Sequence, residues 1–146
     1  IGAVTGQTQN CIDMLKQEEA VIVFPEGVRG TGKGFVKRYQ LQRFGNGFMD
    51  IAIETNTPII PVGIVGCEEA LPMFGNAEGL AQKFGLPYFP ITVPFPIPTR
   101  ITLNFGEPLY FSGPIHSEDD LEAKVNVVKA KIRQLIAEAQ HKHGVK

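Results

Sequence analysis

The residues best suited to chemistry lie together in one short stretch, Phe24 to Gly30. It places the carboxylate of Glu26 three positions before the guanidinium of Arg29. Four glycines lie within it or just after it (Gly27, Gly30, Gly32, Gly34). Glycine lets the backbone approach an anionic group closely, and a guanidinium binds phosphate or carboxylate through two parallel hydrogen bonds. The stretch therefore indicates a binding site for a phosphorylated substrate.

The elements around this stretch are predicted to form a βαβ unit. Val21 to Phe24 predicts a short buried strand, which ends at Pro25 because proline cannot donate to a sheet. Ile59 to Gly66 is a nearly continuous apolar run, typical of a strand covered on both faces. A helix is predicted between them, over Gly47 to Thr55, and two strands joined through such a crossover helix are expected to be parallel. Ligands bind at the carboxyl ends of such strands, which is where Glu26 falls.

Further segments complete a predicted three-layer α/β fold, with a mainly parallel twisted sheet flanked by helices. A helix is predicted from Thr8 to Gln17, and a strand from Arg100 to Phe105 with one buried face (Ile101, Leu103, Phe105). A last helix is expected to be capped by Ser117 and to carry one apolar stripe (Leu121, Val125, Val128, Ile132, Leu135, Ile136, Ala139). Residues Leu86 to Pro98 are predicted to be irregular, and either cover the sheet or form an exposed apolar patch for a bilayer.

The composition predicts one soluble domain: 146 residues, 43% hydrophobic and 20% charged. The net charge of -1 argues against a nucleic-acid-binding protein. Cys11 and Cys67 lack metal-ligand spacing, so we expect no metal and a reduced, cytoplasmic setting. Because the chain starts at Ile1 in what looks like the interior of a domain, we expect residues 1–146 to be the C-terminal portion of a longer single domain.

Three motifs together resemble the glycerolipid acyltransferases. Phe24-Pro25-Glu26-Gly27-x-Arg29 is similar to the third conserved block of that family, and Pro58 to Val62 looks like its fourth. Ile1 to Val4, followed by a helix, resembles the segment around the second block. The resemblance implies a glycerol-3-phosphate acyltransferase-like fold. It also implies transfer of a fatty acyl group from acyl-CoA or acyl-carrier protein to a lysophosphatidate-like hydroxyl, at the inner face of the cytoplasmic membrane, with no further cofactor.

The same resemblance implies roles for the site residues. Arg29 would hold the acceptor phosphate, and Gly27 would allow its close approach. Glu26 would orient the arginine or bond the glycerol hydroxyls, with Pro25 beside it and Pro61 at the pocket wall. The alternative is a loop salt bridge between Glu26 and Arg29 without any ligand.

Two departures from the family pattern affect the chemistry. The His-x4-Asp block, which supplies the general base, is absent, and no histidine of this chain begins such a string (His116, His141, His143). We therefore assign no catalytic residue in this chain, expect the pair upstream of Ile1, and expect residues 1–146 alone to be inactive. A family lysine before the following helix is also missing, and another basic residue would have to compensate (Lys33, Arg38 or Arg43).

Two other functions remain open from the sequence. Gly27 to Lys33 fits part of a phosphate-binding P-loop, but Gly34 stands where a magnesium-binding Ser or Thr is needed. A lipid-binding domain that lost its base would keep the acceptor pocket without the chemistry. Cys67 follows the second predicted strand, where an acyl relay is conceivable, although a small buried cysteine is the expected interpretation.

Overall fold

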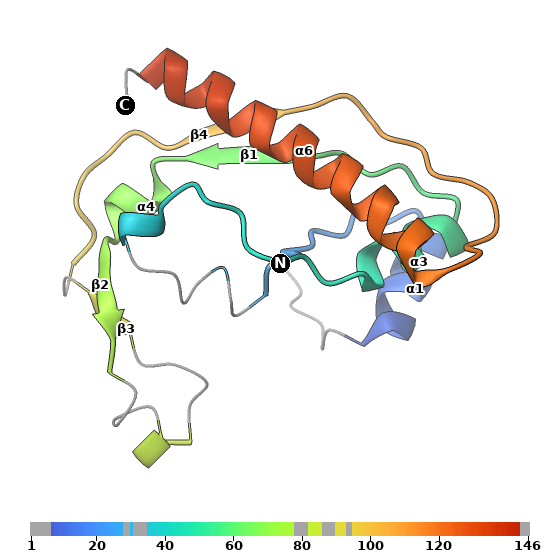
Figure 1. The fold of residues 1–146 in the computed structure, drawn as a ribbon, viewed down its shortest axis with the longest axis horizontal. Helices are drawn as coiled ribbons and strands as arrows, with labels where there is room; N and C mark the ends of the chain where they lie inside the picture. Colours follow the sequence, from blue (N-terminus) through green and yellow to red (C-terminus); the bar gives the residue numbers. More distant parts are fainter. Residues whose placement is uncertain are drawn as a thin grey trace.

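The computed structural model describes residues 7–27, 30, 35–77, 82–85, 90–92 and 95–143. The elements, in chain order, are α1 (Thr8–Lys16), η1 (Phe35–Lys37), α3 (Gly47–Glu54), β1 (Val62–Val65), α4 (Cys67–Ala70), β2 (Met73–Asn76), β3 (Pro90–Thr92), β4 (Thr102–Phe105) and α6 (Glu118–His143). Figure 1 shows the long helix α6 lying across the β1–β4 pair, with α1 and α3 near its N-terminal end and the β2–β3 pair projecting from the other side.

The described strands form two separate antiparallel pairs. In the first, Val62 of β1 lies opposite Phe105 of β4, and Val65 lies opposite Thr102. In the second, β2 pairs with β3 through an irregular register. A mixture of helices and strands is compatible with the α/β class, but the described residues do not show a three-layer parallel sheet. The strand predicted within Ile59 to Gly66 is present as β1, and its described partner is β4.

The predicted buried strand at Val21 to Phe24 is wrong. This segment has no regular secondary structure, and the side chains of Ile22 and Phe24 are 84% and 74% exposed. An extended apolar segment becomes a strand only when a neighbour pairs with its amides and carbonyls. Among the described strands none pairs with Val21 to Phe24, so the predicted parallel βαβ unit is not formed by these residues.

The last helix agrees closely with its prediction. The hydroxyl of Ser117 accepts a hydrogen bond from the amide of Asp120 at 3.2 Å, as expected of an N-cap. The apolar stripe faces the interior, where five of its members are buried (Val125, Val128, Leu135, Ile136, Ala139). One end of the stripe packs on Met49 of α3, and the other end packs on Val65 of β1. The helix therefore connects the two halves of the core.

The strand predicted at Arg100 to Phe105 is present as β4, but its buried face is the opposite one. Phe105 is 64% exposed, whereas Asn104 lies toward α6 and donates a hydrogen bond to the Leu135 carbonyl at 3.1 Å. A period of two predicts alternation along a strand, yet which side is covered depends on where α6 packs. The neighbouring residue Gly63 of β1 lets α6 pack on the side of Asn104.

The proline-rich region is not irregular throughout. Pro90 begins β3, the strand position where a missing amide is best tolerated, so the prediction of irregular structure is wrong there. Three of its described apolar side chains are exposed (Ile91, Phe95, Ile97), which favours the exposed patch over the sheet cover at these positions. Among the helices that the structure describes, none has the length and hydropathy of a membrane-spanning segment.

Candidate functional site

The site is built on a tight turn over Pro25 to Gly27. The amide of Gly27 donates to the Phe24 carbonyl at 3.0 Å, and the amide of Gly30 donates to the Gly27 carbonyl at 3.1 Å. Gly27 has φ of +56°, a left-handed conformation that is readily adopted by glycine. The glycine predicted to allow close approach is thus also needed for the turn itself.

Two hydrogen bonds hold this turn against the segment that leads into α3. The Glu26 Oε1 atom accepts a bond from the Gln42 amide at 2.8 Å, and the Pro25 carbonyl accepts one from the Gly45 amide, also at 2.8 Å. A Cβ atom on Gly30 would lie 2.7 Å from the Glu26 Cβ atom, so any larger residue there would force the turn to shift. The half-buried Glu26 carboxylate therefore fixes the shape of the turn, in addition to any contact it makes with a ligand.

The two remaining predicted site residues are Arg29 and Pro61. Arg29 falls outside the residues that the structure describes, and its contact with a phosphate stays a prediction. Pro61 is fully buried, and its carbonyl accepts a hydrogen bond from the Gly106 amide at 2.9 Å. Its ring lies beside Gly106, just after β4 and close to the Leu135 side chain of α6. The role of Pro61 at a pocket wall also stays a prediction.

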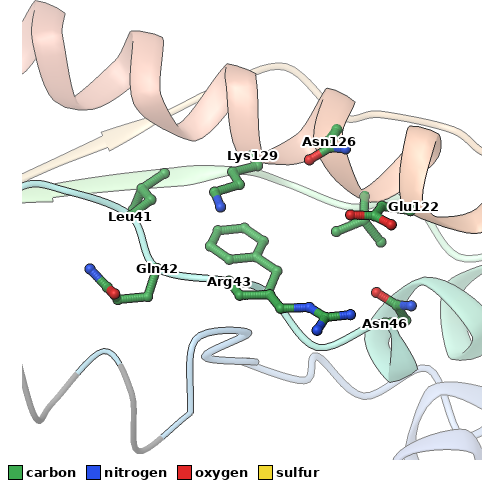
Figure 2. A pocket seen from close by; sticks show the side chains of 9 residues that line it. Leu41, Gln42, Arg43, Asn46, Glu122, Asn126 and Lys129 are labelled. Atoms are coloured by element: carbon green, nitrogen blue, oxygen red, sulfur yellow. The ribbon is translucent and has the colours of Figure 1, made fainter.

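A hollow of about 250 Å³ opens next to the turn, between the segment after η1 and helix α6. Figure 2 shows its rim, where the cationic Arg43 and Lys129 lie with the carboxylate of Glu122. The remaining lining is amide and apolar (Leu41, Gln42, Phe44, Asn46, Val125, Asn126). The Lys129 ammonium lies 5.3 Å from the centre of the Phe44 ring, within the range of a cation–π contact. The hollow suits a small anionic group better than a bare acyl chain.

The three basic residues that could replace the missing lysine have different surroundings. Arg38 pairs with Glu69 at 3.7 Å and lies over the Phe35 ring, so its charge is engaged within the protein. Lys33 belongs to a part of the chain that is not described. Arg43 lines the hollow and directly follows Gln42, the residue that binds Glu26. Of the three, Arg43 is the one that the structure places beside the candidate site.

A polar cluster that the sequence analysis missed lies at the C-terminal end of β1. Tyr39 donates its hydroxyl hydrogen to Glu69, and the Glu68 carboxylate accepts a bond from the Tyr39 amide at 2.6 Å. The signal in the sequence was the pair of adjacent acids, Glu68 and Glu69, shortly after the strand predicted within Ile59 to Gly66. Their partners could not be deduced, because Tyr39 lies about 30 positions earlier in the chain.

Cys67 does not support an acyl relay. It is exposed, so its predicted burial is wrong. Partial desolvation, and then the nearby acids Glu68 and Glu69, raise the pKa of the Cys67 thiol. The reactive form of a cysteine is the thiolate, which a raised pKa disfavours at neutral pH. Within the described part of the chain, no group of three or more His, Cys, Asp or Glu side chains could hold a metal ion.

Comparison with known proteins shows which family part of this chain is similar to. The family model described as Acyltransferase matches residues 3–65, a segment that includes every predicted site residue. An uncharacterized protein of Mycobacterium tuberculosis is 44% identical over 118 residues, covering 71% of this chain and 33% of the relative. A human protein named DGAT1/2-independent enzyme synthesizing storage lipids is 27% identical over 133 residues, covering 89% of this chain and 40% of that protein. No solved structure matches the chain significantly.

Residues 3–65 of the chain are similar to the acyltransferase family. More narrowly, these matches confirm the resemblance and are consistent with a member of the glycerolipid acyltransferase family. The chain spans 33% of the length of the mycobacterial relative and 40% of the length of the human one.

Proposed function

We propose that the protein transfers a fatty acyl group from acyl-CoA or acyl-carrier protein to the hydroxyl of a lysophosphatidate-like acceptor. The observation that carries this proposal is the match of residues 3–65 to the acyltransferase family, since the Pro25–Gly27 turn lies within that segment. The name of the human relative, an enzyme that synthesizes storage lipids, supports a lipid acceptor. The general base is expected from a His-x4-Asp pair in another part of the whole protein.

In this proposal the residues near the turn bind and orient the acceptor. Arg29 follows the turn by two positions and binds the acceptor phosphate through a charge-assisted pair. Arg43 at the hollow adds a second positive charge beside the Glu26 turn. Holding the phosphate fixes the hydroxyl in position for attack, and such orientation supplies a large share of the rate enhancement in two-substrate reactions.

We further propose that the enzyme works at the cytoplasmic face of the membrane, as a peripheral protein. The support is the exposed apolar surface around the β2–β3 pair, which includes Phe74, Ile91 and Phe95. Apolar side chains gathered at a surface favour contact with a bilayer, from which a lipid acceptor would be taken.

Arg29→Ala in the whole protein tests the acceptor site. Loss of a charge-assisted phosphate contact should raise the acceptor KM by about tenfold to a hundredfold, with little change in the donor KM. The measurement is the release of CoA thiol at varied lysophosphatidate and varied acyl-CoA concentrations.

Arg133→Ala is the matched control, because Arg133 is exposed on α6 and carries the same charge. It should leave both constants unchanged. An equal rise of donor and acceptor KM in Arg29→Ala would contradict the phosphate-binding role. Vesicle binding by the wild-type protein without any thiol release would instead indicate a non-catalytic lipid-binding domain.

A further inference from the structure

Tyr39 has a backbone conformation that a bulky side chain rarely adopts. Its φ is +63°, in the left-handed region, where the Cβ atom crowds the following carbonyl. Such a conformation persists only when the surroundings hold it in place, and strained residues of this kind gather at functional sites.

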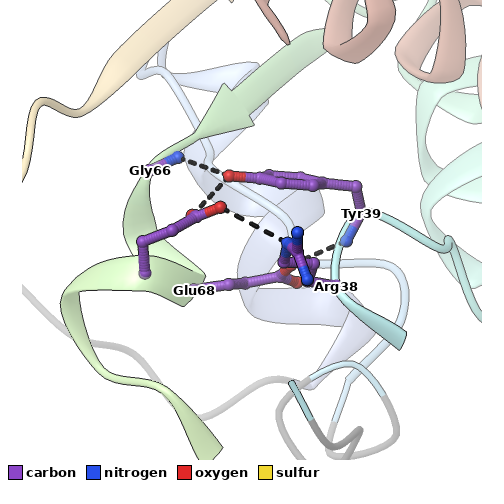
Figure 3. Close-up of polar contacts among 5 residues, drawn as sticks. Arg38, Tyr39, Gly66 and Glu68 are labelled. Carbon is purple, nitrogen blue, oxygen red and sulfur yellow. Dashed lines mark hydrogen bonds and ion pairs between the residues drawn. The ribbon is translucent and has the colours of Figure 1, made fainter. Parts of the chain in front are cut away.

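Three hydrogen bonds fix Tyr39 to the C-terminal end of β1 and to α4 (Figure 3). The Glu68 Oε2 atom accepts from the Tyr39 amide at 2.6 Å, and Glu69 accepts from the Tyr39 hydroxyl. The same hydroxyl oxygen accepts from the Gly66 amide at 3.1 Å. Both the backbone and the side-chain end of Tyr39 are thereby tied to one short stretch, Gly66 to Glu69.

The surroundings strengthen this attachment. The Glu69 Oε1 atom is buried and has no hydrogen-bond partner among the described residues, and the Arg38 guanidinium supplies a counter-charge at 3.7 Å. A Cβ atom at Gly66 would lie 2.0 Å from the Arg100 carbonyl oxygen, so the chain must be glycine there to reach the Tyr39 hydroxyl. The Tyr39 ring also packs against the cluster formed by Val65, Ile136 and Ala139.

The segment that follows Tyr39 is the one that holds the candidate site. Three positions after it, the Gln42 amide donates to Glu26, and the Gly45 amide then donates to the Pro25 carbonyl. The turn over Pro25 to Gly27 is thus attached to residues 40–45, and residues 40–45 begin at Tyr39. Fixing Tyr39 on β1 and α4 sets the position from which Gln42 reaches Glu26.

We infer that Tyr39 is a positioning residue for acceptor binding: its bonds to Gly66, Glu68 and Glu69 hold the segment whose Gln42 and Gly45 amides fix the Pro25–Gly27 turn. The expected effect on the acceptor KM rests on the proposed function. Tyr39 acts through Glu26 and touches no substrate itself. Removing its hydroxyl should therefore weaken acceptor binding and leave the donor site as it is.

Tyr39→Phe in the whole protein tests this, since phenylalanine keeps the ring packing and removes the hydroxyl alone. We expect the acceptor KM to rise about tenfold, with kcat and the donor KM within about twofold of wild type. Tyr110→Phe is the matched control, because Tyr110 is 74% exposed, and it should change none of the three constants.

A double-mutant cycle with Glu26→Ala tests the route. If Tyr39 acts through Glu26, then Tyr39→Phe should alter the acceptor KM by less than about twofold once Glu26 is alanine. A full effect in the Glu26→Ala background would overturn the inference. So would an equal rise of both KM values in Tyr39→Phe, or constants equal to those of wild type.

Hydrogen exchange separates failure of this inference from failure of the proposed function. In Tyr39→Phe, peptides covering residues 40–45 should exchange about tenfold faster, with α6 unchanged, because the Gln42 and Gly45 amides lose their fixed partners. If wild type transfers no acyl group, the proposed function fails, and this measurement still decides the positioning role. Unchanged exchange at residues 40–45 overturns the inference whatever the activity.

Discussion

At the scale of single residues, the proton on Tyr39 is held unusually firmly. Partial burial, followed by the hydrogen bond to Glu69, raises the pKa of Tyr39 above its ordinary value of about 10. The charge of Glu68 acts in the same direction, whereas the Gly66 amide acts against it. A phenolate at Tyr39 would lie beside the two carboxylates of Glu68 and Glu69, whose negative charges disfavour it.

This shift predicts a specific loss of stability in alkaline solution. The pKa of Tyr39 is higher in the folded state than in the unfolded chain, so its contribution to stability is complete below about pH 10 and is lost as the pH rises above that value. The free energy of unfolding should fall more steeply between about pH 9 and about pH 11 in wild type than in Tyr39→Phe. Urea titrations at both pH values measure this.

The thiol of Cys67 is present in both wild type and Tyr39→Phe. Its own titration therefore cancels to first order when the pH dependence of their unfolding free energies is compared. Equal slopes for wild type and Tyr39→Phe would contradict the bonding pattern of the cluster. Such a result would also weaken the inference that the hydroxyl of Tyr39 fixes residues 40–45.

At the scale of elements, the close approach of β1 and α6 determines how the core is built. Gly63 has no side chain, and a Cβ atom there would lie 2.8 Å from both the Ile136 amide nitrogen and the Leu135 Cβ atom. The backbone of α6 can therefore lie directly on β1. This contact also explains why Asn104, rather than Phe105, faces the helix.

Gly63→Ala should consequently separate α6 from β1. Forcing an extra methyl group into a packed contact costs roughly 1–3 kcal/mol of folding free energy. The urea midpoint of the whole protein should fall accordingly. Gly47→Ala is the control: no atom lies within 4 Å of its added Cβ, and stability should stay the same or rise by at most about 1 kcal/mol.

At the scale of the whole molecule, one helix joins both parts of the core. The first buried cluster contains Phe44 and Met49 together with Val125 and Val128 of α6. The second contains Val65 with Ile136 and Ala139 of the same helix. Leu41 and Ile132 pack against both clusters, so neither can loosen without affecting the other.

Unfolding of the described core should accordingly be a single transition. Met49→Ala removes a fully buried side chain and should cost about 2–5 kcal/mol, whereas Val65→Ala removes fewer atoms and should cost less. Both should lower the midpoint of the same transition followed by far-UV circular dichroism. Val127→Ala, at a position 53% exposed, should change stability by less than about 0.5 kcal/mol.

Two separate transitions in Met49→Ala, with the β1 half of the core persisting, would show that α6 does not couple the clusters. A large effect of Val127→Ala would show that helix propensity, rather than burial, dominates the stability of α6. Either result would contradict the two-cluster description.

The site was only partly predictable. The acyltransferase resemblance followed from the motif over Phe24 to Arg29 together with Pro58 to Val62, and the family match over residues 3–65 agrees with it. The bond from Gln42 to Glu26 and the cluster around Tyr39 were not foreseen. These contacts join residues 16 to 30 positions apart, and no local pattern encodes which residues will meet across such distances.

The sequence by itself determined the features that depend on near neighbours: the helix α6 with its Ser117 cap and apolar stripe, the helix α3, and the glycine-dependent turn after Pro25. Their period, capping and backbone constraints are local properties of the chain. Only the tertiary structure decided whether Val21 to Phe24 would be paired, which face of β4 would be covered, and what Tyr39 would hold. Each of these depends on a partner far along the chain, because strand pairing and burial are properties of two surfaces in contact.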